Sequence, residues 1–320
     1  MKYPLRPILL FALFCVFISL LSCSSEIEKR KLIIFHAGSL SVPFKLMKEE
    51  YEKANPEVNI VLEAAGSVAS VRKITELNRE ADIMASADYR IINQMLIPEF
   101  AGWNISFAAN EMVLACRDDS PVASMISQDN WMDVLLQEET HYGRSNPDHD
   151  PCGYRTLVTL KLAEAYYQRP GMAERILQKD KRFIRPKETD LLALLESGTI
   201  EAIFIYRSVA EQHGLSYITL PDSINLKQRE LADWYATATV FIAGKVPGER
   251  ILLNGAPMVY GITMLHAAPN RQEGLRFLAW FFHEEGGRKI LEQQRQPSLI
   301  PAVSKTYINI PKTLQPYARP

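Results

Sequence analysis

Three short segments of the sequence carry residues suited to binding a small anion. In each of them a run of strand-forming residues meets a turn of small or polar residues that opens a helix. The segments are Phe35–Ser39, Glu63–Ser67 and Asn146–Gly153. The start of a helix exposes unpaired N–H groups and carries about half a positive charge. Three helix starts directed at one point would bind an anion without any lysine or arginine.

Two of these turns contain a Gly-Ser pair, Gly38-Ser39 and Gly66-Ser67. Glycine lets the backbone approach a ligand closely, and the serine hydroxyl adds a donor beside the backbone amides. The alternative is structural, because serine at a strand–helix junction commonly serves only as the helix N-cap. The same alternative holds for Asp150, which precedes Pro151 at an expected helix start.

Catalysis by a thiol or a hydroxyl is a competing interpretation. Cys152 lies three residues after His149, but no orienting Asn or Asp is evident, and neither Ser39 nor Ser67 stands in a Gly-x-Ser-x-Gly turn. Cys152 and Cys116 could also form a disulfide, which the sequence alone does not decide. No Cys/His spacing typical of a zinc site is present.

The first residues have the pattern of an export signal. Lys2 and Arg6 precede an apolar run that is too short to span a membrane and that ends in Leu20-Leu21-Ser22-Cys23. This ending resembles a bacterial lipobox, which predicts a lipoprotein signal peptide over residues 1–22, lipidation of Cys23 and a tether over 23–31. An ordinary signal peptide is the alternative. Without Lys2 and Arg6 the chain keeps 34 of its 36 basic residues and all 37 acidic ones, a net charge of −3, so nucleic acid is not an expected partner.

Hydrophobic periodicity predicts an α/β protein. Residues 31–36, 58–63 and 82–85 read as strands that alternate with helices over 42–54 and 68–78. A second α/β set follows over 153–168, 190–196 and 202–206, and residues 112–116 and 259–264 are strands placed where the chain could cross between two lobes. We expect two lobes of mostly parallel sheet with flanking helices and two hinge crossings, the type II periplasmic-binding-protein-like fold. The predicted lobes are residues 32–112 with 258–320, and 113–257.

Several ordered segments resemble the molybdate/tungstate-binding proteins of ABC importers, in particular the tungstate-type branch. The resemblance runs from about Leu32 to Ala302. It is carried by residues 35–44, 63–68, 72–77, 81–89, 145–155, 206–215 and 257–263. It implies that Gly38, Ser39 and Ser67 contact the oxyanion from one lobe and that Asp150, Pro151 and Cys152 approach it from the other.

The chain departs from this family at one position. In archaeal members, the counterpart of Asp150 and a glutamate directly before the Tyr-Arg-Ser-Val-Ala motif supply carboxylate oxygens to the metal, which becomes six-coordinate. Here Ile205 occupies the second position. Asp150 therefore has three open roles: helix N-cap, ligand to the metal atom of the oxyanion, or acceptor of a proton from protonated phosphate.

The leading hypothesis is a non-catalytic, membrane-tethered receptor that captures tungstate or molybdate outside the cytoplasm and delivers it to an ABC permease. A sulfate or phosphate receptor of the same fold is one alternative, and an extracytoplasmic Cys or Ser hydrolase is another. We expect a monomer with no cofactor, held at the membrane only by its lipid anchor.

Overall fold

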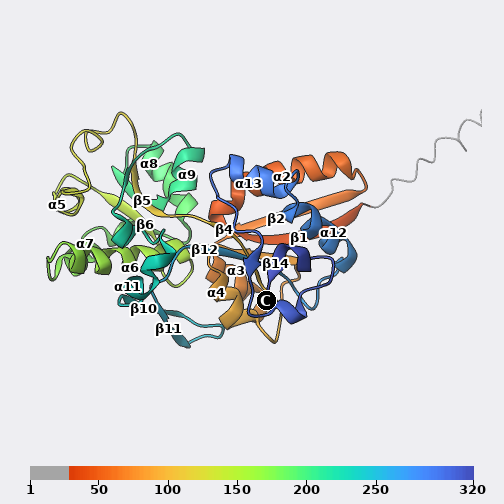
Figure 1. Ribbon diagram of the computed structural model, residues 1–320. Helices are drawn as coiled ribbons and strands as arrows, with labels where there is room; N and C mark the ends of the chain where they lie inside the picture. The colour runs from red at the N-terminus through yellow and green to blue at the C-terminus, as the bar shows by residue number, and fades with distance from the viewer. Residues whose placement is uncertain (1–28) are drawn as a thin grey trace, which may run out of the picture.

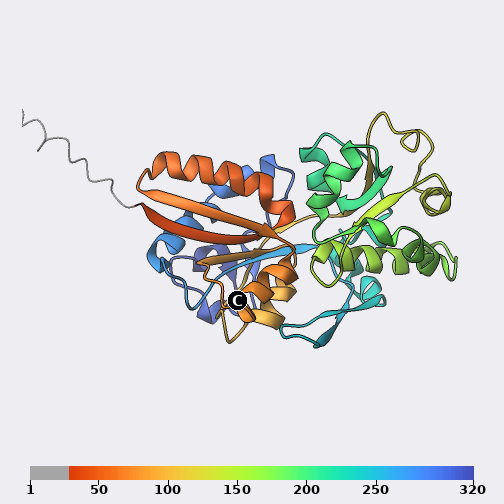
Figure 2. The same cartoon turned by 180° about the vertical axis from the view of Figure 1, so that it is seen from behind.

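The computed structural model describes residues 29–320, which form two α/β lobes side by side (Figure 1). The expected signal peptide, Cys23 and most of the tether lie outside the described residues. Each lobe is built on a five-stranded sheet flanked by helices, and the chain passes between the lobes more than once (Figure 2). Within residues 29–320, no helix combines the length and the apolar character needed to cross a bilayer.

The first lobe contains the sheet with strand order β2-β1-β3-β12-β4. Its strands are β1 (Arg30–Ala37), β2 (Val58–Ala65), β3 (Ile83–Ser86), β4 (Ile105–Ala109) and β12 (Val259–Met264). The helical segments of this part are η1 (Gly38–Leu40), α2 (Ser41–Ala54), α3 (Ser67–Thr75), α4 (Tyr89–Ile91), the π-helix η2 (Ile92–Leu96), α12 (Arg271–Phe282) and α13 (Gly287–Gln293). Short elements end the chain: β13 (Ala302–Val303), η6 (Tyr307–Asn309), η7 (Gln315–Tyr317) and β14 (Ala318–Arg319).

The second lobe contains the sheet with strand order β7-β6-β8-β5-β9. Its strands are β5 (Met112–Cys116), β6 (Tyr142–Ser145), β7 (Ile184–Arg185), β8 (Ala202–Tyr206) and β9 (Ser216–Thr219). The helical segments are α5 (Trp131–Leu136), α6 (Pro151–Tyr166), α7 (Met172–Lys179), η3 (Lys181–Phe183), η4 (Glu188–Leu191), α8 (Leu192–Glu196), α9 (Arg207–Gln212), α10 (Asp222–Asn225), η5 (Arg229–Leu231) and α11 (Ala232–Tyr235).

A hairpin of β10 (Thr239–Ala243) and β11 (Arg250–Asn254) extends from the second lobe along the edge of the first (Figures 1 and 2). Its tip is tied to the first lobe, because the Lys245 ammonium lies 3.0 Å from Glu99 and the Thr75 hydroxyl donates to the Lys245 carbonyl at 3.0 Å. The hairpin therefore bridges the two lobes on one side.

The predicted fold class is confirmed, with one correction to the sheets. Each sheet has two parallel and two antiparallel pairings, so the sheets are mixed and not mostly parallel. The antiparallel pairings all involve β5 or β12, the strands predicted at the crossings between lobes. A strand that enters a lobe from the other one runs against the strands beside it, and local sequence patterns do not reveal this direction.

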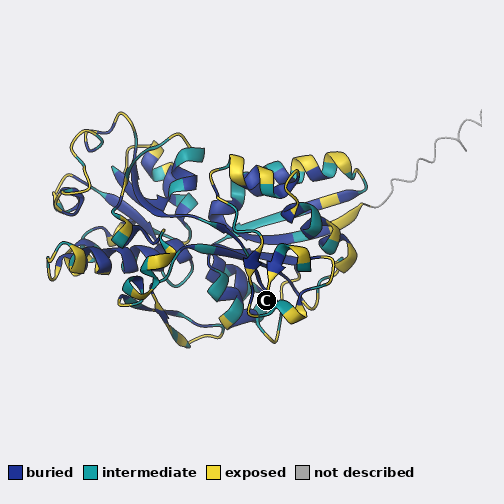
Figure 3. Cartoon of the chain, viewed as in Figure 1, coloured by how far each residue is buried: buried dark blue, intermediate teal, exposed yellow. Residues whose placement is uncertain are grey.

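Both sheets are buried on their inner surfaces, whereas exposed residues lie on the outer helices and loops (Figure 3). In the first lobe, Phe44, Phe277 and Phe281 form an aromatic cluster between α2 and α12, with ring centroids 5.8–6.5 Å apart. Phe277 and Phe281 belong to the buried face of α12. The cluster holds the two helices against β1, whose end leads into the first Gly-Ser turn.

Candidate functional site

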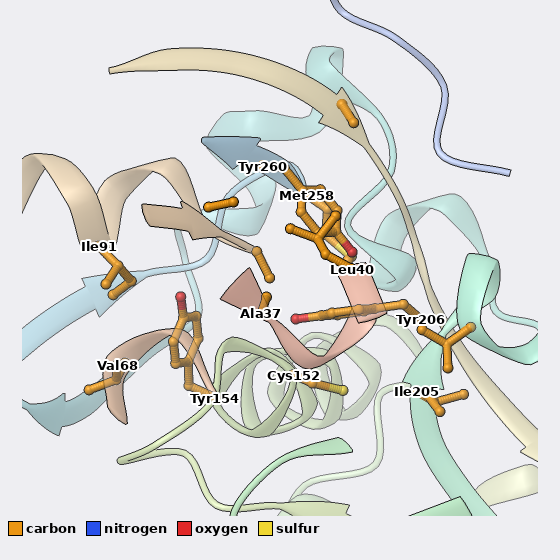
Figure 4. Close-up of a cluster of buried hydrophobic side chains, with 14 of the residues drawn as sticks. Ala37, Leu40, Val68, Ile91, Cys152, Tyr154, Ile205, Tyr206, Met258 and Tyr260 are labelled. Atoms are coloured by element: carbon orange, nitrogen blue, oxygen red, sulfur yellow. The ribbon is translucent and has the colours of Figure 1, made fainter. Parts of the chain in front are cut away.

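The three predicted strand–turn–helix junctions all exist and meet between the lobes. β1 leads into η1 and α2, β2 leads into α3, and β6 leads into α6. Gly66 lies so close to the second lobe that an added Cβ would overlap the backbone carbonyl of His149 and approach Asp150 Cβ to 3.0 Å. The Ala69 N–H donates to the His149 carbonyl at 3.1 Å, which joins the start of α3 to the turn before α6. Side chains of both lobes surround the end of β1 at Ala37 (Figure 4).

The Ser39 hydroxyl is held in place by two residues of the crossing region. Tyr260 donates a hydrogen bond to Ser39 Oγ at 3.0 Å, and the Tyr260 oxygen in turn accepts one from Asn110 at 3.0 Å. The Tyr260 hydroxyl donates its only proton to Ser39 Oγ. The Ser39 hydroxyl can therefore donate its own proton to another acceptor. Ser39 is buried in η1 and makes no side-chain cap.

The Ser67 hydroxyl is oriented in the same way by the backbone. The Ala87 N–H donates to Ser67 Oγ at 3.0 Å, so this hydroxyl also keeps its own proton for another acceptor. Gly66 is the N-cap residue of α3 and no side chain caps this helix. The structural alternative for both serines is therefore wrong, since neither hydroxyl serves as a helix cap.

The start of α6 differs from the other two. Asp150 is its N-cap, with Oδ1 accepting from the Cys152 N–H at 3.3 Å and Pro151 in the first turn. The Gly153 N–H is bonded to the Asp150 carbonyl at 3.0 Å. The expectation that this helix start offers free amides is thus wrong, because Asp150 satisfies them. What α6 presents between the lobes is a buried carboxyl group.

A second carboxyl group, which the sequence interpretation missed, lies beside Asp150. Glu188 is the first residue of η4, and its backbone N–H donates to Asp150 Oδ2 at 3.0 Å. Both side chains are buried. Burial raises the pKa of Asp150, and burial together with the charge of Asp150 raises the pKa of Glu188 well above its usual value. A signal was available, since Glu188 follows the short strand β7 just as the other turns follow their strands.

The site also contains an arginine, contrary to the expectation of an anion site without Lys or Arg. Arg155 of α6 is fully buried, and its Nη1 donates to the Ala87 carbonyl at 2.8 Å and to the Tyr206 hydroxyl at 3.0 Å. Its Nη2 lies 3.4 Å from Asp88 Oδ2, across the contact between lobes. Although burial opposes it, the charges of Arg90 and Arg155 hold the pKa of Asp88 at about 2.

Several buried polar atoms in this region lack a hydrogen-bond partner within the described residues. They are Ser145 Oγ, Arg155 Nε and both carboxyl oxygens of Glu188, whereas Arg155 Nη2 has only its ion pair with Asp88. Buried polar atoms in folded proteins are almost always paired, so these atoms are candidate contacts for a polar ligand.

The buried thiol of Cys152 does not support nucleophilic catalysis. Its Sγ contacts the Phe204 carbonyl at 3.6 Å, and burial, with the charges of Asp150 and Glu188, raises its pKa well above the usual value. A neutral thiol is a poor nucleophile. Cys116 and Cys152 are both free thiols, so the open question of a disulfide is answered. His36 is a core histidine, stacked on Phe44 with a ring-centroid distance of 5.2 Å, and burial lowers its pKa to about 4.

The chain belongs to the family of bacterial extracellular solute-binding proteins, whose sequence model matches residues 32–294. It is a binding protein and not an enzyme. Two relatives are similar over nearly their full length. An uncharacterized solute-binding protein of Petrotoga mobilis is 43% identical and covers 97% of this chain and 96% of its own. The molybdate/tungstate-binding protein WtpA of Pyrococcus abyssi is 42% identical over 89% of both chains.

Solved structures with the same fold have much lower sequence identity. The periplasmic molybdate-binding protein of Azotobacter vinelandii has a TM-score of 0.58 at 15% identity, covering 83% of this chain and 98% of its own. The sulfate-binding protein SubI of Mycobacterium tuberculosis has a TM-score of 0.59 at 9% identity, covering 85% and 88%. These matches establish the two-lobe fold, which is shared by receptors for different oxyanions.

Proposed function

We propose that this protein captures molybdate or tungstate between its two lobes and delivers it to an ABC permease. The observation that carries the proposal is that the Ser39 and Ser67 hydroxyls, each with a proton to donate, belong to turns packed against the second lobe, where Gly66 lies beside the buried residue Asp150. Hydroxyls and helix-start amides suit the oxide oxygens of the ligand. A carboxylate repels a dianion unless it can reach an electron-poor centre that expands its coordination, as Mo(VI) and W(VI) do and sulfur does not. The similarity to the Pyrococcus abyssi protein supports the same ligands.

The ligand-contacting residues in this proposal come from both lobes. Gly38, Ser39 and Ser67 bind the oxide oxygens from the first lobe, and Asp150, Pro151 and Cys152 close the site from the second. Asp150 is both the N-cap of α6 and a ligand to the metal atom. No resident cofactor is needed, because the oxyanion is the cargo.

Ligand binding in this proposal closes two lobes that comprise residues 32–112 with 258–320, and residues 113–257. The sheet memberships support this division, because β1 to β4 and β12 share one sheet and β5 to β9 the other. The closed monomer is the form that the permease receives.

The anchoring part of the proposal concerns residues outside the described range. Residues 1–22 act as a lipoprotein signal peptide, Cys23 carries the lipid, and residues 23–31 tether the receptor to the extracytoplasmic side of the membrane. A Cys23→Ala variant would then be recovered in the soluble fraction of a bacterial host, whereas the parent sediments with membranes. Equal sedimentation of the two would refute the anchor while leaving the receptor function intact.

Isothermal titration of residues 29–320 with tungstate, molybdate, sulfate and phosphate tests the ligand directly. We expect tight binding of the first two and weak binding of the others. A ligand that binds only the folded state raises stability by about 2.7 kcal/mol at a hundredfold excess over Kd, so a thermal melt gives a second readout. Preference for sulfate or phosphate would replace the proposed ligand, and no response to any of the four would refute an oxyanion receptor.

A further inference from the structure

Glu188 is an unusual buried residue because its carboxyl group lies against a second buried carboxyl group, that of Asp150, and not against a cation. The side chain is only 1% exposed, and within residues 29–320 neither carboxyl oxygen accepts a hydrogen bond. The neighbouring Lys187 pairs with Asp190 and not with Glu188. Two buried carboxyl groups side by side are unfavourable, because both cannot be ionised at such short range. Such a pair of carboxyl groups is best explained if a bound ligand contacts both in the functional protein.

The carboxyl group of Glu188 is directed at the first Gly-Ser turn. A Cβ added to Gly38 would lie 2.9 Å from Glu188 Oε2 and 3.0 Å from Oε1. The backbone of Glu188 meanwhile fixes Asp150 through the N–H bond to Oδ2. Asp150 approaches Gly66 through its Cβ, and Glu188 approaches Gly38 through its carboxyl oxygens, so each Gly-Ser turn of the first lobe meets an acidic residue of the second.

Glu188 also lies on the same side of the second sheet as Ile205. Ile203 and Leu191 both contact the position that a Cβ on Gly143 would take, so Ile203 faces η4. Alternate residues of a strand share a face, and Ile205 is two residues after Ile203 in β8. A carboxylate at position 205 would therefore extend into the region that η4 covers, where Glu188 already places one.

We propose that Glu188 supplies the second carboxylate of the oxyanion site, donating an oxygen lone pair to the metal atom of bound molybdate or tungstate. This inference rests on the proposed function. Asp150 and Glu188 together add carboxylate oxygens to the four oxide oxygens, no oxide leaves, and any proton on the coordinating carboxyl passes to solvent. Ile205 cannot coordinate the metal atom, but in this proposal the second carboxylate comes from Glu188 in η4 and not from position 205 in β8.

Two carboxylates at one site would decide which oxyanion is accepted. Opposite a sulfur or phosphorus centre they can form no additional bond and only repel the dianion, strongly so in a site shielded from water. Opposite Mo(VI) or W(VI) the same oxygens become ligands. Glu188 is thus a selectivity residue, and its removal should weaken tungstate binding while relieving the repulsion of sulfate.

Isothermal titration of Glu188→Gln with tungstate and sulfate tests this directly. The substitution keeps the shape of the side chain and removes its charge. We expect tungstate affinity to fall about 10- to 100-fold, the loss of one strong charged contact, and sulfate affinity to rise. Asp190→Asn is the matched control, because it neutralises a carboxyl two residues away in η4 that pairs with Lys187, and it should bind like the parent.

The tungsten L3-edge absorption spectrum of the bound ligand reports the number of oxygen neighbours around tungsten. This number would not change if Glu188 had only a structural role. We expect more than four oxygen neighbours around tungsten in the parent and fewer in Glu188→Gln. The ligand-free variant should melt at or above the parent temperature, since a contact between two buried carboxyl groups has been removed. If the parent binds tungstate but Glu188→Gln matches it in affinity, sulfate rejection and spectrum, the inference fails alone. A parent that binds neither tungstate nor molybdate would overturn the proposed function and this inference together.

Discussion

The Tyr260 hydroxyl donates to Ser39 Oγ at 3.0 Å while accepting from Asn110, so a residue of the crossing strand β12 decides which way the Ser39 proton points. Ser67 is oriented by a different donor, the Ala87 N–H, with the same outcome. Two serines that are far apart in the sequence thus reach the contact between the lobes as oriented donors. This arrangement explains why both positions carry a hydroxyl although neither caps a helix.

Ser39→Ala and Ser67→Ala should each weaken tungstate binding by about 1.5–3 kcal/mol, because each removes a hydrogen bond to a charged ligand. Titration calorimetry measures the loss as an approximately 10- to 100-fold rise in Kd. Ser124→Ala is a control, since its hydroxyl bonds only to the Pro121 carbonyl in a surface turn. If both serine variants bind tungstate as tightly as the parent, the ligand does not bind at these turns.

Tyr260→Phe tests the orientation of Ser39 separately from its presence. The variant keeps the ring against Phe107, 5.7 Å between centroids, but loses the proton that fixes Ser39. We expect a smaller rise in Kd than for Ser39→Ala, because the serine can still donate after it has lost its preferred direction. A Kd change as large as that of Ser39→Ala would mean that Tyr260 itself contacts the ligand.

Gly66→Ala should impair closure of the lobes without unfolding them. The backbone at Gly66 has φ −57° and ψ 141°, which alanine adopts readily, so the only penalty is the overlap of its Cβ with the His149 carbonyl of the other lobe. We expect the melting temperature of the ligand-free protein to change little and tungstate affinity to fall at least about tenfold, as lost contacts between the lobes would cause. Small-angle scattering with excess tungstate should show compaction of the parent only. Equal compaction of the variant would contradict this account.

The three junctions that form the candidate site were predictable because they depend on local patterns. The strands before Gly38, Gly66 and Asp150 and the helices after them follow from hydrophobic periodicity and turn residues, and the predicted spans agree with β1, β2, β8 and α6 to within a few residues. The resemblance of ordered motifs then placed them in one family, which the match over residues 32–294 confirms.

Charged residues that become buried only when distant segments meet were not predictable. The hydrophobic pattern of α6 does not indicate that Arg155 is buried. Arg155 is buried because Ala87 and Asp88 cover it from the other lobe. Glu188 stands in a segment rich in charged residues, 185–190, which indicates a solvated surface, but η4 folds onto Asp150. Such positions depend on tertiary packing, which periodicity does not encode.

Asp88 should make stability depend on pH in the acid range. Its folded-state pKa of about 2 lies below the ordinary value of 3.8, because Arg90 and Arg155 outweigh the effect of burial. A depressed carboxyl pKa stabilises the fold above the unfolded value, and that stability disappears as pH falls through the folded value. At about 1.4 kcal/mol per pKa unit, Asp88 contributes about 2 kcal/mol at neutral pH.

Denaturant melts of the parent and Asp88→Asn measure this contribution. The difference between their free energies of unfolding should be constant above about pH 5 and should narrow by about 2 kcal/mol near pH 2. A difference that does not change with pH would contradict the assigned ion pairs.

Asp150→Asn separates the capping role of Asp150 from the coordinating role. An amide oxygen can still cap α6, because Asn and Asp are comparable N-caps, but the amide nitrogen cannot accept the second of the two N–H bonds, from Cys152 and Glu188. We therefore expect a stability loss of about 1 kcal/mol, the typical value of one hydrogen bond.

If Asp150 also coordinates the metal atom, tungstate affinity should fall by more than this loss explains, since an amide oxygen is a weaker donor than a carboxylate. If Asp150 only caps the helix, removal of a negative charge beside a dianion should leave affinity unchanged or improve it. Calorimetry with tungstate, read beside the melting temperature of the ligand-free variant, distinguishes the two, and unchanged or tighter binding would rule out coordination by Asp150.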